Sequence, residues 1–270
     1  MTDRGPESAD QSHGDEARTA QLRDALAAVR ERIARAAHAA GRSEEDLTLV
    51  AVTKFFPASD VAALVALGVR DIGESRDQEA GDKLAELAEI TSERPTVHFV
   101  GQLQTNKAGH VAGYADVVQS VDRVRLVRAL DRALDSATTD ADRRLAVLLQ
   151  VDLDQPVDLD QPSGTDRRPG PAAGAARGGC RPDDLAALAD AVAGADHLDL
   201  RGLMAVAPRD GDPAEAFARL HELSQRLRAD HPEATWVSAG MSGDLEQAVA
   251  AGATHLRVGS AILGARPPAG

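Results

Sequence analysis

Short aliphatic runs alternate with longer helical patterns along almost the whole chain, and this alternation limits the fold more than any other feature. The runs predict eight strands, at 47–52, 69–72, 97–100, 116–118, 145–151, 198–204, 235–238 and 255–258. Helical apolar spacing predicts helices at 59–67, 76–87, 121–134, 182–192, 213–228 and 245–250. Eight βα units favour an α/β fold with a single closed (β/α)8 (TIM) barrel. An open doubly wound sheet is the alternative.

The chain predicts one folded domain with two additions. Residues 1–17 lack apolar periodicity and predict a disordered tail, and residues 18–270 predict the barrel. An extra N-terminal helix is expected from about Thr19 to Ala40, with Gly41 as its stop. The segment at about 153–179 overlaps two tandem VDLDQP copies (151–156 and 157–162) and predicts an inserted flexible loop on the carboxyl-terminal face. A tolerated surface insertion is favoured over a lid.

Composition disfavours several classes of function. A formal net charge of -13 without a basic stripe disfavours nucleic acid and membrane surfaces as partners. The single cysteine, Cys180, cannot form an internal disulfide and leaves no cysteine-based metal cluster. No apolar run approaches the ~18 residues of a membrane helix, and the polar start lacks a signal-peptide core. A cytoplasmic protein is expected.

Lysine is rare, since only three of the 30 basic residues are lysines, and arginine cannot replace lysine in imine chemistry. Lys54 directly follows the first predicted strand, which puts it at the barrel face where ligand sites form. A partly desolvated amine there can attack an aldehyde, and a lysine that merely extends from a strand end is an equal alternative. Lys83, four residues after Glu79, predicts a solvated ion pair. Lys107 is a weaker candidate near the same face.

Two loops of small residues follow the seventh and eighth predicted strands. The first is SAGMSGD (238–244), and the second begins RVGS (257–260). Such loops of a barrel often bind phosphate, because glycine lets backbone N–H groups approach the oxygens and serine hydroxyls donate as well. The same spacing also occurs in common turns, so the spacing alone leaves an ordinary turn as the alternative.

Seven motifs over residues 20–267 together resemble the pyridoxal phosphate homeostasis proteins, single-domain relatives of the alanine racemase N-terminal barrel. They are AVTK (51–54), GESRDQE (73–79), HFVGQLQTNK (98–107), SVDR (120–123), RGLMAVAP (201–208), SAGMSGDLEQAVAAG (238–252) and RVGSAILGAR (257–266). The resemblance implies pyridoxal 5′-phosphate as the cofactor. The cofactor-binding residues that it implies are Lys54, Met241, Ser242, Arg257, Gly259 and Ser260.

The resemblance also implies roles for these residues. Lys54 would carry the Schiff base as an internal aldimine, Ser242, Gly259 and Ser260 would help bind the phosphate, and Arg257 would face the pyridine nitrogen. A charged guanidinium donates to that nitrogen without protonating it, which leaves the ring a weaker electron sink. Transaminase and decarboxylase chemistry is disfavoured accordingly.

Some positions depart from the family pattern. Ser75 stands where asparagine is usual, Asp77 replaces an apolar residue, and Val97 replaces a tryptophan. The insertion after the fifth strand is long. The first change puts a polar contact near the cofactor in doubt, and none affects Lys54 or the phosphate loops.

The function implied is storage or delivery of the vitamin B6 cofactor without turnover, with cofactor-dependent apo-enzymes as recipients and a monomer or weak dimer as the assembly. No catalytic or metal-ligating residue is assigned. The first alternative is an amino-acid racemase, which needs a second acid–base group opposite Lys54. The single tyrosine, Tyr114, is expected to pack, and His98 is expected to be a core or supporting group. The second alternative is a barrel enzyme that binds a phosphorylated substrate and no aldehyde.

Overall fold

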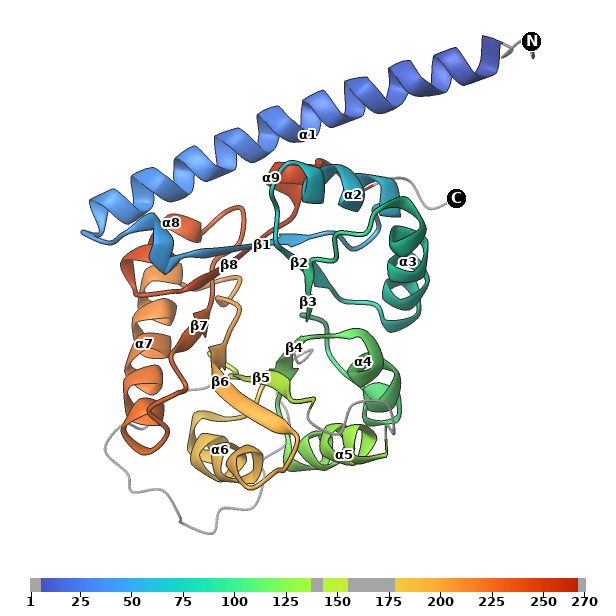
Figure 1. The fold of residues 1–270 in the computed structure, drawn as a ribbon. Helices are drawn as coiled ribbons and strands as arrows, with labels where there is room; N and C mark the ends of the chain where they lie inside the picture. Colours follow the sequence, from blue (N-terminus) through green and yellow to red (C-terminus); the bar gives the residue numbers. More distant parts are fainter. Residues whose placement is uncertain (1–5, 137–142, 155–177, 267–270) are drawn as a thin grey trace.

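Eight parallel strands close into one barrel in the computed structural model, which describes residues 6–136, 143–154 and 178–266 (Figure 1). The last strand pairs with the first, so the sheet has no open edge. The predicted (β/α)8 barrel is confirmed, and the open doubly wound sheet is wrong. The strands are β1 (Thr48–Val52), β2 (Asp71–Glu74), β3 (Thr96–Phe99), β4 (Val117–Val121), β5 (Leu145–Gln150), β6 (Leu198–Met204), β7 (Trp236–Ser238) and β8 (His255–Val258).

Helices surround the barrel, and the main hydrophobic core lies between them and the strands (Figure 1). Their apolar stripes face the strands, whereas their charged faces meet solvent. The helices are α1 (Pro6–Ala39), α2 (Ala58–Ala66), α3 (Asp77–Ile90), α4 (Ala108–Tyr114), α5 (Val124–Asp135), α6 (Leu185–Ala193), α7 (Pro213–Asp230), α8 (Leu245–Ala250) and α9 (Ser260–Leu263).

Helix α1 is the predicted extra helix, but it begins earlier than expected. It starts at Pro6 rather than near Thr19. Proline suits the first turn of a helix, because its fixed φ is helical and its missing N–H would have no partner there. Residues 14–17 are exposed, as the absence of apolar periodicity predicts. The helix packs across α2, α8 and α9, and Gly41 ends it with φ +65° as predicted.

Strand β2 begins two residues later than the apolar run predicts, because the end of α2 uses Val69. The Gly68 N–H donates to the Val65 carbonyl at 2.9 Å, and the Val69 N–H donates to the Leu64 carbonyl at 3.0 Å. With Gly68 at φ +83°, these two bonds form a Schellman motif. Val69 therefore belongs to the helix cap, and β2 starts at Asp71.

The insertion leaves the barrel from the end of β5. Val151 forms a parallel bridge with Cys180, and the Cys180 N–H donates to the Gln150 carbonyl at 2.7 Å. The described ends of the insertion thus meet at the carboxyl-terminal face. The rest of the predicted loop, residues 155–177, lies outside the described residues. Burial, followed by nearby acidic groups, raises the pKa of the Cys180 thiol to about 12, which makes it unreactive.

Within the described ranges, every helix is too short or too polar to cross a membrane. In the same ranges, no cluster of three or more His, Cys, Asp or Glu side chains could hold a metal ion. The expected cytoplasmic location stays a prediction.

The barrel interior is partly polar, and His255 is one of its buried groups. Burial, and then repulsion from His98, lowers the pKa of His255 to about 4 from 6.5. The unfolded chain therefore binds a proton between these values that the folded chain does not, so acidification favours unfolding.

We expect the free energy of unfolding to fall by up to about 3 kcal/mol as the pH drops from 6.5 to 4 through this group. Chemical denaturation at several pH values measures how steeply the free energy of unfolding changes with pH. His255→Asn should flatten this dependence, whereas His38→Asn, on the exposed surface of α1, should not. An equally steep slope in His255→Asn would contradict the assignment.

Candidate functional site

Lys54 lies just beyond the carboxyl end of β1, at the mouth of the barrel, and is partly buried. Strand β1 pairs with β8, so the loop after β8 lies directly beside it. The approach is close at Gly259, where an added Cβ would lie 3.2 Å from the Val52 carbonyl oxygen. The segment around Lys54 and the loop after β8 are therefore neighbours, although they lie far apart in the sequence.

The backbone on both sides of Lys54 is held by side chains from α3. The Thr53 carbonyl accepts a hydrogen bond from the Lys83 ammonium at 2.8 Å. After Lys54, Phe55 has φ +72°, an uncommon conformation for a residue with a side chain, and its N–H donates to the Glu79 carboxylate. These bonds fix the direction in which Lys54 leaves the strand.

Lys83 corrects a prediction. It does pair with Glu79, at 3.3 Å, but it is buried rather than solvated and pairs more closely with Glu74, at 2.7 Å. Burial raises the pKa of the Glu74 carboxyl, against the opposing effect of Lys83. The four-residue spacing in the sequence could reveal the pair of Lys83 with Glu79. It could not reveal Glu74, the buried carboxylate at the end of β2 that pairs with the same lysine.

The two small-residue loops meet at the same mouth. The Ser260 hydroxyl lies 3.3 Å from the Ser242 hydroxyl, which also accepts from the Ala261 N–H at 3.3 Å. Met241 is 39% exposed, and its N–H donates to the Asp244 carboxylate at 2.6 Å. Hydroxyl and amide donors at the start of the short helix α9 form a set suited to an anion.

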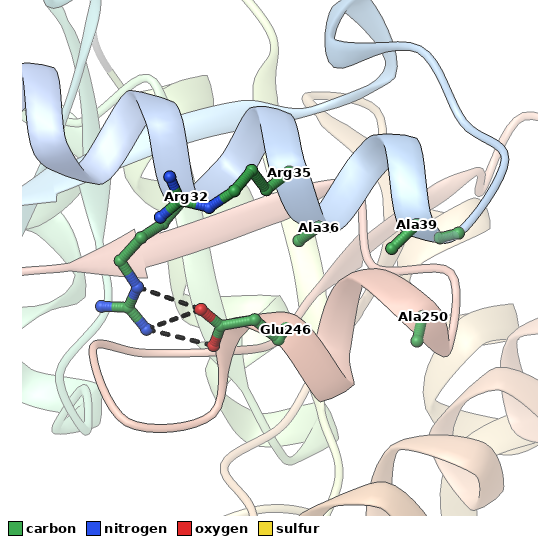
Figure 2. A pocket seen from close by; sticks show the side chains of 7 residues that line it. Arg32, Arg35, Ala36, Ala39, Glu246 and Ala250 are labelled. Carbon is green, nitrogen blue, oxygen red and sulfur yellow. Dashed lines mark hydrogen bonds and ion pairs between the residues drawn. The ribbon is translucent and has the colours of Figure 1, made fainter.

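Helix α1 supports the first of these loops. Arg32 donates to the Ser242 carbonyl at 3.1 Å and pairs with Glu246 of α8 at 2.9 Å. Figure 2 shows Arg32 reaching from α1 toward Glu246, beside a groove between α1 and α8. Four alanines line the groove together with Arg32, Arg35 and Glu246, and Arg32 and Glu246 are already paired with each other. The mouth of the barrel is therefore the stronger candidate site.

Arg257 is buried at the end of β8. It donates to the Ser238 hydroxyl at 2.6 Å and to the Ala205 carbonyl at 2.8 Å. Burial lowers the pKa of its guanidinium to about 10, with Asp244 opposing the shift. The group keeps its proton at neutral pH, so it is a charged donor and not an acid.

Other nominated residues lie apart from this cluster. Lys107 is half-exposed and pairs with Asp77 at 3.6 Å. Tyr114 packs edge-on against His110, with ring centroids 5.6 Å apart, and burial raises the pKa of its hydroxyl. His98 is buried inside the barrel, as expected for a core or supporting group.

Sequence reasoning missed Gln119 of β4, which is fully buried and bonded to both His98 and Ser238. The available signal was a glutamine inside the apolar run VVQSV (117–121). A polar amide in a fully buried strand requires partners, although the sequence does not name them.

The comparisons with known proteins agree with this architecture. The family described as alanine racemase, N-terminal domain, matches residues 170–267. A pyridoxal phosphate homeostasis protein of Mycobacterium tuberculosis is 43% identical over 258 residues, which are 92% of this chain and 94% of the relative. The protein of that name from Escherichia coli is 35% identical over 89% of this chain and 95% of the relative.

Solved structures are similar as well. PipY of Synechococcus elongatus with PLP bound has a TM-score of 0.70 at 31% identity, covering 90% of this chain and 100% of that chain. An alanine racemase of Corynebacterium glutamicum, with a TM-score of 0.59 at 17% identity, covers 91% of this chain and 63% of that chain and shares the fold. By its identity to curated relatives over nearly their whole length, the chain belongs to the pyridoxal phosphate homeostasis protein family.

Proposed function

We propose that this protein binds pyridoxal 5′-phosphate at the mouth of its barrel and takes part in the homeostasis and supply of that cofactor. The observation that carries the proposal is Lys54, which lies at the end of β1 beside the loops that hold Ser242 and Ser260. The PLP-bound PipY structure, 31% identical, supports it.

The residues at the mouth fit the cofactor. Ser242 and Ser260 offer hydroxyl donors for a phosphate, and Gly259 leaves out a Cβ that would crowd the Val52 carbonyl. Lys54 has the amine that an aldehyde requires, and Arg257 has a buried charged donor for the pyridine nitrogen. When bound, the cofactor supplies an electrophilic aldehyde and a conjugated ring that accepts electrons.

The arginine favours binding over turnover. A guanidinium whose pKa is about 10 holds its proton, so Arg257 orients the ring without giving the ring nitrogen a full positive charge. The ring then withdraws electrons less strongly than it would beside a carboxylic acid. We accordingly propose a non-catalytic carrier, with cofactor-dependent apo-enzymes as the recipients.

The alternative is an amino-acid racemase. It needs a second proton-transfer group opposite Lys54, but Tyr114 packs on α4 and His98 is buried and hydrogen-bonded to Gln119. Neither side chain offers a free acid–base group at the mouth.

Hydrogen exchange separates the carrier from the racemase. The cofactor-loaded protein is incubated with L-alanine in D2O, and α-deuteration and D-alanine are measured against free pyridoxal phosphate and Lys54→Ala. The carrier should give no more exchange than free cofactor. Exchange that depends on Lys54 and yields D-alanine would favour the racemase.

A further inference from the structure

A chain of hydrogen bonds crosses the barrel interior and ends on Arg257. It joins side chains from five strands that are far apart in the sequence but meet when the barrel closes. Four of the five side chains are buried, and the one at the amino-terminal rim is partly exposed. In order along the chain they are Arg257 (β8), Ser238 (β7), Gln119 (β4), His98 (β3) and Asp71 (β2).

The bonds nearest the mouth involve Arg257, Ser238 and Gln119. Arg257 donates from Nη1 to the Ser238 Oγ at 2.6 Å. Ser238 in turn donates to the Gln119 Oε1 at 2.7 Å. Because the serine hydroxyl has a single hydrogen, its bond to Gln119 leaves its lone pairs available to the guanidinium.

The remaining bonds continue in the same direction. The Gln119 Nε2 donates to the His98 Nδ1 at 2.8 Å, so that nitrogen carries no hydrogen. The His98 Nε2 then holds the hydrogen and donates to Asp71, at 3.0 Å. Every donor points away from Arg257 toward a carboxylate, an arrangement in which each bond polarises and strengthens the next.

We propose that Gln119 and Ser238, supported by His98, are positioning residues that hold Arg257 against the pyridine nitrogen of pyridoxal phosphate. The inference rests on the proposed function. An arginine side chain has four torsions, and among the described residues the Arg257 side chain has two hydrogen bonds, of which one goes to Ser238. Removing Gln119 frees the Ser238 hydroxyl to rotate and leaves the His98 Nδ1 without its donor.

The test compares two ligands that differ only at the ring nitrogen. These are pyridoxal phosphate and its 1-deaza analogue, which has C–H in place of that nitrogen but keeps the aldehyde and the phosphate. Contacts of Lys54, Ser242 and Ser260 are common to both ligands, so the ratio of the two dissociation constants reports the bond from Arg257. Spectroscopic titration gives both constants.

The wild-type protein should bind pyridoxal phosphate roughly 10-fold more tightly than the analogue, as expected for a hydrogen bond from a charged donor. Gln119→Leu and Ser238→Ala should bring the ratio close to one. Ser238→Thr, which keeps the hydroxyl, should restore it. Gln150→Leu is the matched control, because Gln150 is a buried barrel glutamine that bonds to the Gly178 carbonyl instead. This control should leave the ratio unchanged.

Two outcomes would overturn the inference. A ratio that persists in folded Gln119→Leu and Ser238→Ala would mean that the chain only fills the barrel, and so would a wild-type ratio of one. Wild-type protein that binds neither ligand would instead overturn the proposed function, and the inference with it. Thermal unfolding of each variant verifies that it is folded, and Ser238→Ala removes only one oxygen.

Discussion

Replacing Lys83 with methionine is expected to lower the free energy of unfolding by about 3–5 kcal/mol, the usual effect of removing one partner of a buried ion pair. The substitution leaves Glu74, which is fully buried, and Glu79 without their shared cation. It also removes the donor to the Thr53 carbonyl. Urea denaturation of both proteins measures the difference.

The decrease in the free energy of unfolding that Lys83→Met causes should become larger as the pH rises. Burial raises the pKa of Glu74 even with Lys83 present, and the variant loses the opposing cation. A carboxyl whose folded pKa lies above its unfolded value stabilises at low pH, and this contribution disappears as pH rises through the folded pKa. The variant should therefore be closest to wild type below pH 4.5, the ordinary pKa of a glutamate carboxyl.

Lys107→Met is the matched control, because Lys107 forms a half-exposed ion pair with Asp77 at 3.6 Å. Exposed pairs contribute roughly 0–1 kcal/mol, so this variant should unfold almost like wild type. Glu74→Gln combined with Lys83→Met should recover part of the stability. A loss in Lys83→Met as small as that in Lys107→Met would show that the buried pair stabilises nothing.

Replacing Lys54 with arginine is expected to abolish covalent retention of pyridoxal phosphate. Arginine keeps the charge and most of the length but cannot bond an aldehyde. The protein would still bind pyridoxal phosphate through its contacts with the phosphate and the ring. The dissociation constant for pyridoxal phosphate should therefore rise by roughly 100-fold, equivalent to about 3 kcal/mol. Gel filtration followed by cofactor quantification measures retention.

Lys107→Arg controls for the loss of a lysine that lies outside the candidate site, and this variant should retain the cofactor as wild type does. The free energy of unfolding of Lys54→Arg should stay close to wild type, because Lys54 is only partly buried. If Lys54→Arg retained the cofactor fully, a lysine other than Lys54 would have to form the covalent bond, and the assignment would be wrong.

Strands β6 and β8 have the bounds that the sequence predicts. In both, aliphatic residues alternate with polar or charged ones, LDLRGLM in β6 and HLRV in β8, which is the period of a strand. Strand β2 was predicted too early, because the Schellman motif at Gly68 uses Val69, an apolar residue indistinguishable in sequence from a strand residue. The start of α1 was missed because helix formation there does not require an apolar face.

The candidate site divides in the same way. Lys54 and the loops after β7 and β8 could be nominated, because strand ends of a barrel share one face. The surroundings that position them could not. The partners of Gln119 come from β3 and β7, and those of Lys83 come from the ends of β1 and β2, so both sets depend on how distant segments meet on barrel closure.

The most direct test of the central claim is to load the wild-type protein with pyridoxal phosphate, reduce it with borohydride, and identify the modified peptide by mass spectrometry. Only three lysines are present, so the assignment is unambiguous. We predict one pyridoxyl group per chain on Lys54, with Lys83 and Lys107 unmodified. A colourless protein that takes up no cofactor, or one modified at another lysine, would contradict it.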